Sequence, residues 1–260
     1  MISMFKAAFK AEWVGIGGSR GVFFTVILPL AVGLPLFITT AVAMVSEYLA
    51  KTSSLVGVLS TTTDNAAYWI IHLTVIVFAS LAAFSQAASY RGSYGDMYRH
   101  LLPKVGISLA ARWAILTLIA AGSIVIMLVV ALAVLPVVSP HGYGEVDLLS
   151  PTAARLLWAV PLYACAALAL GLGLGALMER PAFAVACLLI WALLIENATA
   201  VLPGGARIIR FMPFLNGIYG TGQRVGLEPP WGNNGALGYF VLLAVVFVAL
   251  GWLKQRRTPQ

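Results

Sequence analysis

The sequence contains few charged residues and few of the side chains that metal binding or catalysis needs. Charged residues make up 10% of the 260 residues and hydrophobic residues 61%. A soluble domain has roughly 25% charged and roughly 45–50% apolar residues. This imbalance excludes a soluble enzyme, a disordered chain and a nucleic-acid-binding protein. The two cysteines, Cys165 and Cys187, lie inside apolar runs, and no Cys/His spacing indicates a metal site.

Two common motifs, for nucleotide binding and for zinc-dependent hydrolysis, are also missing. The chain has no phosphate-binding G-x-x-x-x-G-K-[ST] loop and no H-E-x-x-H zinc motif. Glu145 and Asp147 lie close together, but a solvated turn between Pro140 and Pro151 explains them. We therefore expect this chain to have no catalytic site, no metal site and no cofactor of its own.

Long apolar runs dominate what the sequence does contain. A helix needs about 20 apolar residues to cross a bilayer, and six segments meet this requirement. They are residues 22–45, 68–88, 107–138, 156–178, 182–202 and 237–253. The third run is too long for one straight crossing and too short for two, so we expect one crossing with a cytoplasmic extension around Arg112. The sequence predicts an all-α polytopic membrane protein that forms a single domain over residues 1–260.

The distribution of Lys and Arg predicts the orientation in the membrane. If the N-terminus is cytoplasmic, 11 of the 16 Lys and Arg residues fall on the cytoplasmic side and 5 on the outer side. Cytoplasmic loops carry the excess of positive charge in membrane proteins. We therefore expect both termini to be cytoplasmic, in a multi-pass protein of the inner or plasma membrane.

An amphipathic stretch, residues 4–14, precedes the first apolar run. The aromatic residues Phe5, Phe9 and Trp13 recur at every fourth position, with lysines beside them. This pattern is typical of a helix that lies in the cytoplasmic interface of the membrane. A solvated leader is the alternative.

The segment between the second and third runs predicts a second amphipathic helix. Ser93 and Asp96 match the S-x-x-D pattern of a helix start, and Pro103 ends the segment. An apolar stripe with helical spacing runs along it, formed by Tyr94, Met97, Tyr98, Leu101 and Leu102. The stripe must pack against its own neighbours, the membrane interface or a partner protein. A partner is favoured because the chain has no cytoplasmic domain to cover it.

The outer segment between the fifth and sixth runs, residues 203–235, is rich in glycine and proline. It therefore cannot form one regular element. Within it we expect a short helix over Ala206–Met212 on the outer membrane face, with Pro213 and Phe214 turning the chain. This helix would be either a lid over an exit path or a structural cap on the bundle.

Glu196 is the one carboxylate that the sequence places well inside an apolar run. A charge at the centre of a membrane costs roughly 2.5–3.5 kcal/mol on insertion scales. We expect Glu196 to pair with Arg207 or Arg210 of the outer segment. A direct role beside a substrate path, together with Phe211 and Phe214, is the alternative.

Small residues recur at every fourth position of the fourth run, at Ala167, Gly171 and Gly175. This spacing allows two helix backbones to approach closely. A contact within the chain is favoured over a seam between two copies.

The layout and two local strings resemble the permease subunit of ABC-2 type ABC transporters. The stretch from Arg91-Gly92-Ser93 to Leu101-Leu102-Pro103 is similar to the family's segment after the second span, and Arg210–Phe214 is similar to its outer loop. Three residues depart from the family pattern. Ser89 and Tyr90 stand where an acidic residue is common, and Ser93 stands where threonine is usual.

This resemblance implies a role for each unusual segment. Residues 4–14 would be the elbow helix, and Gly92–Leu102 would be the coupling helix that docks its apolar stripe on a separate ATPase subunit. Glu179 and Arg180 would form a second ATPase contact. Glu196, Arg207, Arg210, Phe211 and Phe214 would line the substrate pathway or its outer gate.

The resemblance also implies the partners and the reaction. Two permeases, identical or paralogous, would combine with two ATPases, which bind the ATP and Mg and drive export. The cargo would be a drug, an antimicrobial peptide or a lipid, and membrane lipids would surround the complex. The alternatives are a membrane-embedded lipid-modifying enzyme and a structural or regulatory subunit that transports nothing.

Overall fold

The computed structural model describes residues 2–15, 20–52, 60–89, 105–178, 180–226 and 228–257. Within these residues every regular element is a helix, and no β-strand occurs. Among the described residues, six helical segments are long and apolar enough to cross a membrane. They are Phe23–Thr52, Ile70–Ala88, Gly106–Val138, Pro151–Met178, Pro181–Thr199 and Gly232–Arg257. The prediction of six helices of sufficient length and hydrophobicity to span a membrane is confirmed.

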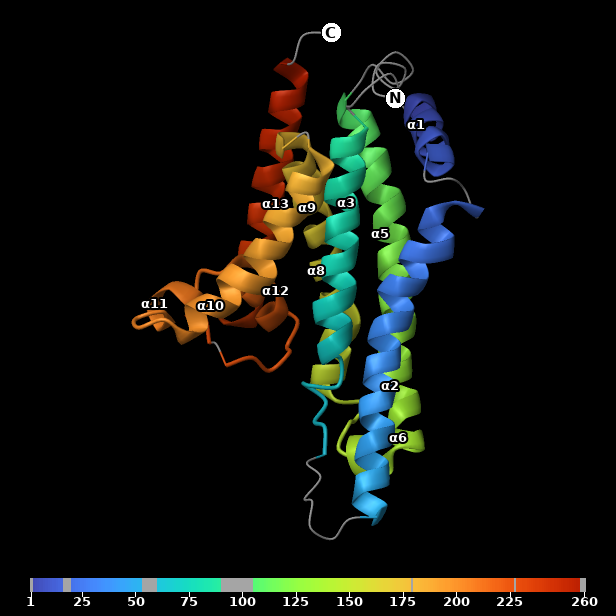
Figure 1. Ribbon diagram of the computed structural model, residues 1–260, viewed down its shortest axis with the longest axis vertical. Coiled ribbons are helices and arrows are strands. Elements are labelled where there is room, and N and C mark those ends of the chain that lie inside the picture. The colour runs from blue at the N-terminus through green and yellow to red at the C-terminus, as the bar shows by residue number, and fades with distance from the viewer. Residues whose placement is uncertain are drawn as a thin grey trace.

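The helices carry the following labels in Figure 1. The main elements of the six spans are α2 (Leu28–Thr52), α3 (Val75–Ala88), α5 (Val105–Val129), α8 (Pro151–Met178), α9 (Pro181–Leu189) and α13 (Gly232–Arg257). Short π-helical stretches extend or interrupt the spans, and one of them joins α9 to α10 (Glu196–Val201). The long third run is a continuous helical segment, as expected for one crossing.

Several helices extend beyond the apolar runs from which they were predicted. The first predicted run ends at residue 45, whereas its helix continues to Thr52 and includes Glu47 and Lys51. The last predicted run begins at residue 237, whereas α13 begins at Gly232. The runs were bounded by hydrophobicity, but a helix continues through polar residues wherever they find partners. The Glu47 contacts described below are an example.

Both chain termini lie at the same end of the bundle (Figure 1). The C-terminal end of α3 and the N-terminal end of α5 lie at that end too. We call it the terminal end. Helix α1 (Ile2–Gly15) stands beside the bundle there, packed against α5, and agrees with the helix predicted over 4–14.

Helix α8 occupies the centre of the bundle. It packs against α3, α13, α5 and α9, and it is the most buried of the six spans, whereas α2 is the least buried. A Cβ atom added at Gly171 would overlap the carbonyl oxygen of Ala79, and one at Gly175 would overlap that of Ala83. The glycines therefore let α8 and α3 pack backbone to backbone, and the predicted contact within the chain is confirmed.

The segment between α10 and α13 differs from its prediction. The helix expected over Ala206–Met212 is only one turn long, α11 (Ala206–Ile209). Pro213 and Phe214 do not simply turn the chain, because they begin a further helix, α12 (Pro213–Gly220). Proline is favoured at the first position of a helix, where no intrahelical N–H bond is lost. In Figure 1, α10 and α11 project sideways from the bundle, and α12 leads the chain back to α13.

Candidate functional site

A buried ion pair joins α1 to the bundle at the terminal end. Arg112 Nε lies 2.8 Å from Glu12 Oε2, and Arg112 Nη2 donates to Glu12 Oε1 at 3.0 Å. Ser108 Oγ also donates to Glu12 Oε1, at 3.0 Å. Arg112 and Glu12 are 5% and 3% exposed, so two opposite charges are removed from solvent together. A bidentate arginine–carboxylate pair of this kind is among the strongest polar contacts in proteins.

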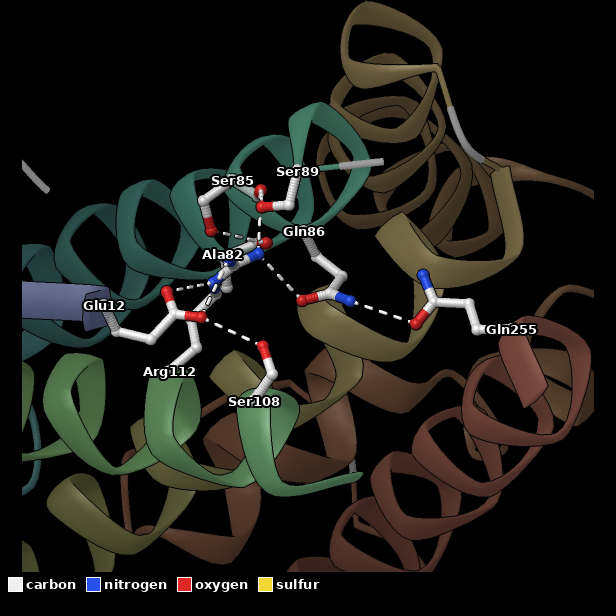
Figure 2. Close-up of polar contacts among 8 residues, drawn as sticks. All are labelled: Glu12, Ala82, Ser85, Gln86, Ser89, Ser108, Arg112 and Gln255. Atoms are coloured by element: carbon white, nitrogen blue, oxygen red, sulfur yellow. Dashed lines mark hydrogen bonds and ion pairs between the residues drawn. The ribbon is translucent and has the colours of Figure 1, made fainter. Parts of the chain in front are cut away.

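The same arginine extends the contacts to two further helices (Figure 2). Arg112 Nη1 donates to the backbone oxygen of Ser85 and to Gln86 Oε1, both at 2.9 Å and both on α3. Gln86 Nε2 then donates to Gln255 Oε1 on α13 at 3.2 Å. We call Glu12, Gln86, Ser108, Arg112 and Gln255 the terminal cluster. It connects α1, α3, α5 and α13 through buried polar side chains.

The terminal cluster is not evident from local sequence patterns. The aromatic residues of residues 4–14 indicate a membrane interface, and the position of Arg112 indicates a cytoplasmic extension, but neither pattern joins the two segments. One signal was available: Glu12 is the one acidic residue among residues 2–15, and Arg112 is the one charged residue among residues 105–138. Isolated opposite charges in two apolar helices favour each other as partners.

A second carboxylate cluster lies near the C-terminal end of α2. Glu47 accepts hydrogen bonds from the backbone N–H of His141 at 2.9 Å and from Ser139 Oγ at 3.4 Å. His141 Nδ1 and Lys51 Nζ lie 2.8 and 2.9 Å from its Oε1 atom. These contacts fasten α2 to α7 (Pro140–Tyr143). Unlike Arg112, Lys51 and His141 are largely exposed.

Glu196 is held by the start of α12 rather than by arginine. Its Oε1 and Oε2 atoms accept hydrogen bonds from the backbone N–H groups of Phe214, at 2.9 Å, and Leu215, at 2.8 Å. The side chain is 1% exposed. The first N–H groups of a helix have no intrahelical acceptor and carry partial positive charge, which a carboxylate satisfies.

The predicted pairing of Glu196 with Arg207 or Arg210 is therefore wrong. Both arginines are exposed. Arg210 Nε donates to the backbone oxygen of Arg207 at 3.1 Å, and its guanidinium lies 5.1 Å from the centre of the Phe211 ring. A cation nearby in sequence is the obvious partner for a buried carboxylate, but Pro213 begins a helix whose first N–H groups take that place.

The five predicted pathway residues consequently divide into two groups. Glu196 and Phe214 are buried, and the Phe214 ring lies 5.5 Å from that of Phe240 on α13. Arg207, Arg210 and Phe211 lie on the surface of the segment that projects from the bundle. The structure therefore places two of them in the packing of α12 and three where a ligand or partner could reach them.

The predicted ATPase-coupling residues lie almost entirely outside the described residues. This holds for Tyr94, Met97, Tyr98, Leu101, Leu102 and Glu179. Arg180 is described, and it is exposed in extended backbone immediately before α9.

The buried carboxylates of the described residues serve contacts between elements and form no metal-binding group. No group of three or more His, Cys, Asp or Glu side chains within them could hold a metal ion. Glu12, Glu47 and Glu196 each bond to groups on another element. Their arrangement is suited to fixing helices relative to one another.

Comparisons with known protein families, with curated proteins and with solved structures give no match to this chain. Function must therefore follow from the layout of the helices and from the polar contacts that connect them. Two features stand out: the terminal cluster at one end, and α12 held by Glu196 between the fifth and sixth spans.

Proposed function

We propose that this chain is the permease subunit of an ATP-driven exporter that resembles the ABC-2 type ABC transporters. The observation that carries the proposal is the attachment of α1 to three spanning helices through the terminal cluster. This attachment occurs at the end of the bundle that holds both termini. A helix fixed in this way moves with the bundle as one body.

The proposed power source is a separate ATPase bound at the terminal end. Helix α1 acts as the elbow helix, and residues 92–102 act as the coupling helix, with Tyr98 and Leu101 in the ATPase contact. Arg180, exposed ahead of α9, suits a second contact. ATP and Mg bind to the partner, and closure of two ATPases moves two permeases. Because it carries the shared contacts of four helices, the terminal cluster transmits this movement to α3, α5 and α13.

The projecting segment between the fifth and sixth spans provides the outer gate in this proposal. Glu196 fixes the start of α12, so the position of α12 depends on the end of the fifth span. The exposed Arg207, Arg210 and Phe211 are available to a departing substrate.

The proposed cargo is apolar or amphipathic, such as a drug, an antimicrobial peptide or a lipid. The described spans expose mainly large apolar side chains, and their buried polar groups are mostly bonded to one another. A sugar or an ion would need free polar groups for recognition. We include in the same proposal that both termini are cytoplasmic and that the protein lies in the inner or plasma membrane.

The test is purification of the tagged chain in mild detergent, followed by ATPase and transport assays in proteoliposomes. We expect an ATP-hydrolysing subunit to co-purify. Leu101→Asp should abolish its recovery or uncouple hydrolysis from transport, and Tyr98→Asp should do the same. The matched control is His100→Asp, which lies on the polar side of the same predicted helix and should retain both activities.

Full transport by both stripe variants would contradict the coupling assignment. Recovery of the chain alone, without ATPase activity after several gentle extractions, would contradict the exporter itself. That second result would favour a membrane-embedded enzyme or a subunit that transports nothing.

A further inference from the structure

A half-open apolar groove of about 370 Å³ lies between α5, α8 and α13. Its walls include Leu109 and Trp113 of α5, Leu172 of α8, and Val245, Ala249 and Trp252 of α13. The volume is in the lower part of the range for small-molecule sites, roughly 300–1,000 Å³. The apolar walls favour a hydrocarbon occupant.

Two tryptophan rings are fixed in the walls. Trp113 Nε1 donates to the backbone oxygen of Cys165 on α8 at 3.0 Å. Trp252 reaches from α13 to the start of α5, where a Cβ atom added at Gly106 would lie 3.2 Å from its Nε1 atom. Tryptophan is enriched where membrane helices pass from hydrocarbon to head groups. Trp252 therefore marks the head-group end of the groove.

Positive charge is concentrated at that same end. The guanidinium of Arg256 lies 5.3 Å from the centre of the Trp252 ring, and the arginine is exposed. Lys254 and Arg257 belong to the same last turn of α13. Lys254 Nζ donates to the backbone oxygen of Leu177 at 2.6 Å, which leaves Arg256 as the basic group stacked on the groove wall.

The groove together with the last turn of α13, up to Arg256, is about as long as one leaflet of a bilayer. From Val245 to Arg256 the helix axis rises about 16 Å. Half of a hydrocarbon core is about 15 Å deep. A chain that starts at Arg256 and follows the wall to Val245 therefore spans about one leaflet, which is the depth of a lipid acyl chain.

We propose that this groove is a binding site for an anionic phospholipid, with one acyl chain between α5 and α13 and the phosphate on Arg256. Charge complementarity selects this occupant, because basic pockets between membrane helices on the cytoplasmic side bind anionic head groups. Arginine matches phosphate geometry. The site is independent of transport, so it stands whether or not the chain is a permease.

The test uses the full-length protein, stripped of lipid in detergent and titrated with dioleoyl phosphatidylglycerol or dioleoyl phosphatidylcholine. Native mass spectrometry counts the bound lipids. We expect one phosphatidylglycerol to bind about fivefold more tightly than phosphatidylcholine, as expected for one basic residue near a membrane surface. Arg256→Gln should remove this preference, and Arg257→Gln, the matched control, should keep it.

A second pair of variants tests the groove itself. Ala249→Trp fills it from α13 and should eliminate the tightly bound phosphatidylglycerol. Leu250→Trp, on the next residue and outside the groove, should not. Both positions are exposed, so both variants are expected to fold. Thermal unfolding verifies this, and Ala110→Phe blocks the groove from α5 if Ala249→Trp is unstable.

Equal affinity for the two lipids in the unmodified protein would overturn the proposal, because it would indicate nonselective annular lipid. Retention of phosphatidylglycerol by the stable groove-filling variant would also overturn it. A change of oligomeric state in that variant, with lipid binding unchanged, would identify the groove as a contact between two copies instead.

Discussion

The centre and the edge of the bundle are held together by different interactions. At the centre, Gly171 and Gly175 bring the backbone of α8 against that of α3. At the edge, α1 and α2 depend on polar side chains, namely Arg112 with Glu12 and His141 with Glu47. Both regions are rich in apolar residues, so their apolar content does not explain why they are held together differently.

The membrane explains why both mechanisms are needed. Lipid tails are as apolar as leucine, so burying an apolar face against another helix gains little from the hydrophobic effect. Close backbone packing gains dispersion energy, and a bond between polar groups avoids leaving them unsatisfied in hydrocarbon. An edge helix has few neighbours to pack against, and a few polar bonds determine its position.

The largest expected effect is at the terminal cluster. Arg112→Met leaves the Glu12 carboxylate buried without its cation, which costs about 3–5 kcal/mol when one partner of a buried pair is removed. Unfolding of the purified protein in mixed micelles, followed by circular dichroism, measures the loss. The control is Arg20→Met, because Arg20 is exposed near the start of the first span.

The double variant Glu12→Gln with Arg112→Met sharpens the same test. Removing both charges should restore part of the stability, because no uncompensated charge remains. If the loss of stability in the double variant equals the sum of the losses in the two single variants, the two side chains stabilise the protein independently. The cluster would then not be the link between α1 and the bundle.

The second-largest expected loss of stability is at the packing of α8 against α3 in the centre of the bundle. Gly171→Ala should force α8 away from α3, because the new methyl group meets the backbone oxygen of Ala79, which cannot move alone. Overpacking of this kind typically costs about 1–3 kcal/mol. Gly122→Ala is the matched control, since a Cβ atom there meets nothing within 4 Å. Similar stability of the two variants in mixed micelles would exclude close packing as the central interaction.

Glu196 belongs to neither region, and its variant should have a smaller effect. Glu196→Gln keeps one oxygen for the N–H groups of Phe214 and Leu215 but loses the charge. We expect a loss of about 1 kcal/mol, a fraction of the roughly 1.5–3 kcal/mol that hydrogen bonds to charged groups contribute, because the neutral amide oxygen still accepts a bond. The melting temperature should fall relative to Glu228→Gln, an exposed control. If the protein transports, unchanged substrate selectivity would indicate a structural role, whereas altered selectivity with full stability would support a pathway role.

Hydrophobicity and spacing were sufficient to predict six spans, the helix over residues 4–14 and the small-residue contact of α8. These features depend on residues that are neighbours in one helix. The partner of Glu12 is 100 residues away and that of Glu47 is 94 residues away. No local pattern specifies which helices meet, and the isolated opposite charges of Glu12 and Arg112 were the one sequence signal that pointed to such a pair.

The error at Glu196 has a different physical origin. Side-chain cations are the partners that the sequence suggests for Glu196, but the donors are backbone N–H groups, which every residue except proline possesses. Identifying them required knowing that α12 begins at Pro213 and returns to the bundle. Proline was interpreted as a turn, although the same residue also suits the first position of a helix.

The smallest expected effect is at a single hydrogen bond between α2 and the second span. Thr74 Oγ1 donates to the backbone oxygen of Ala31 at 3.0 Å, and Thr74 is fully buried. Thr74→Val keeps the shape of the side chain and removes the donor. Interhelical hydrogen bonds in membrane proteins average about 0.6 kcal/mol, and a loss of this size should appear in mixed-micelle unfolding. Thr40→Val is the matched control, because Thr40 Oγ1 bonds within its own helix, to Leu36. A loss at Thr74 as large as that of Arg112→Met would contradict the view that the buried ion pair dominates the edge, since α2 would then depend on a neutral bond as strongly as α1 depends on a charged one.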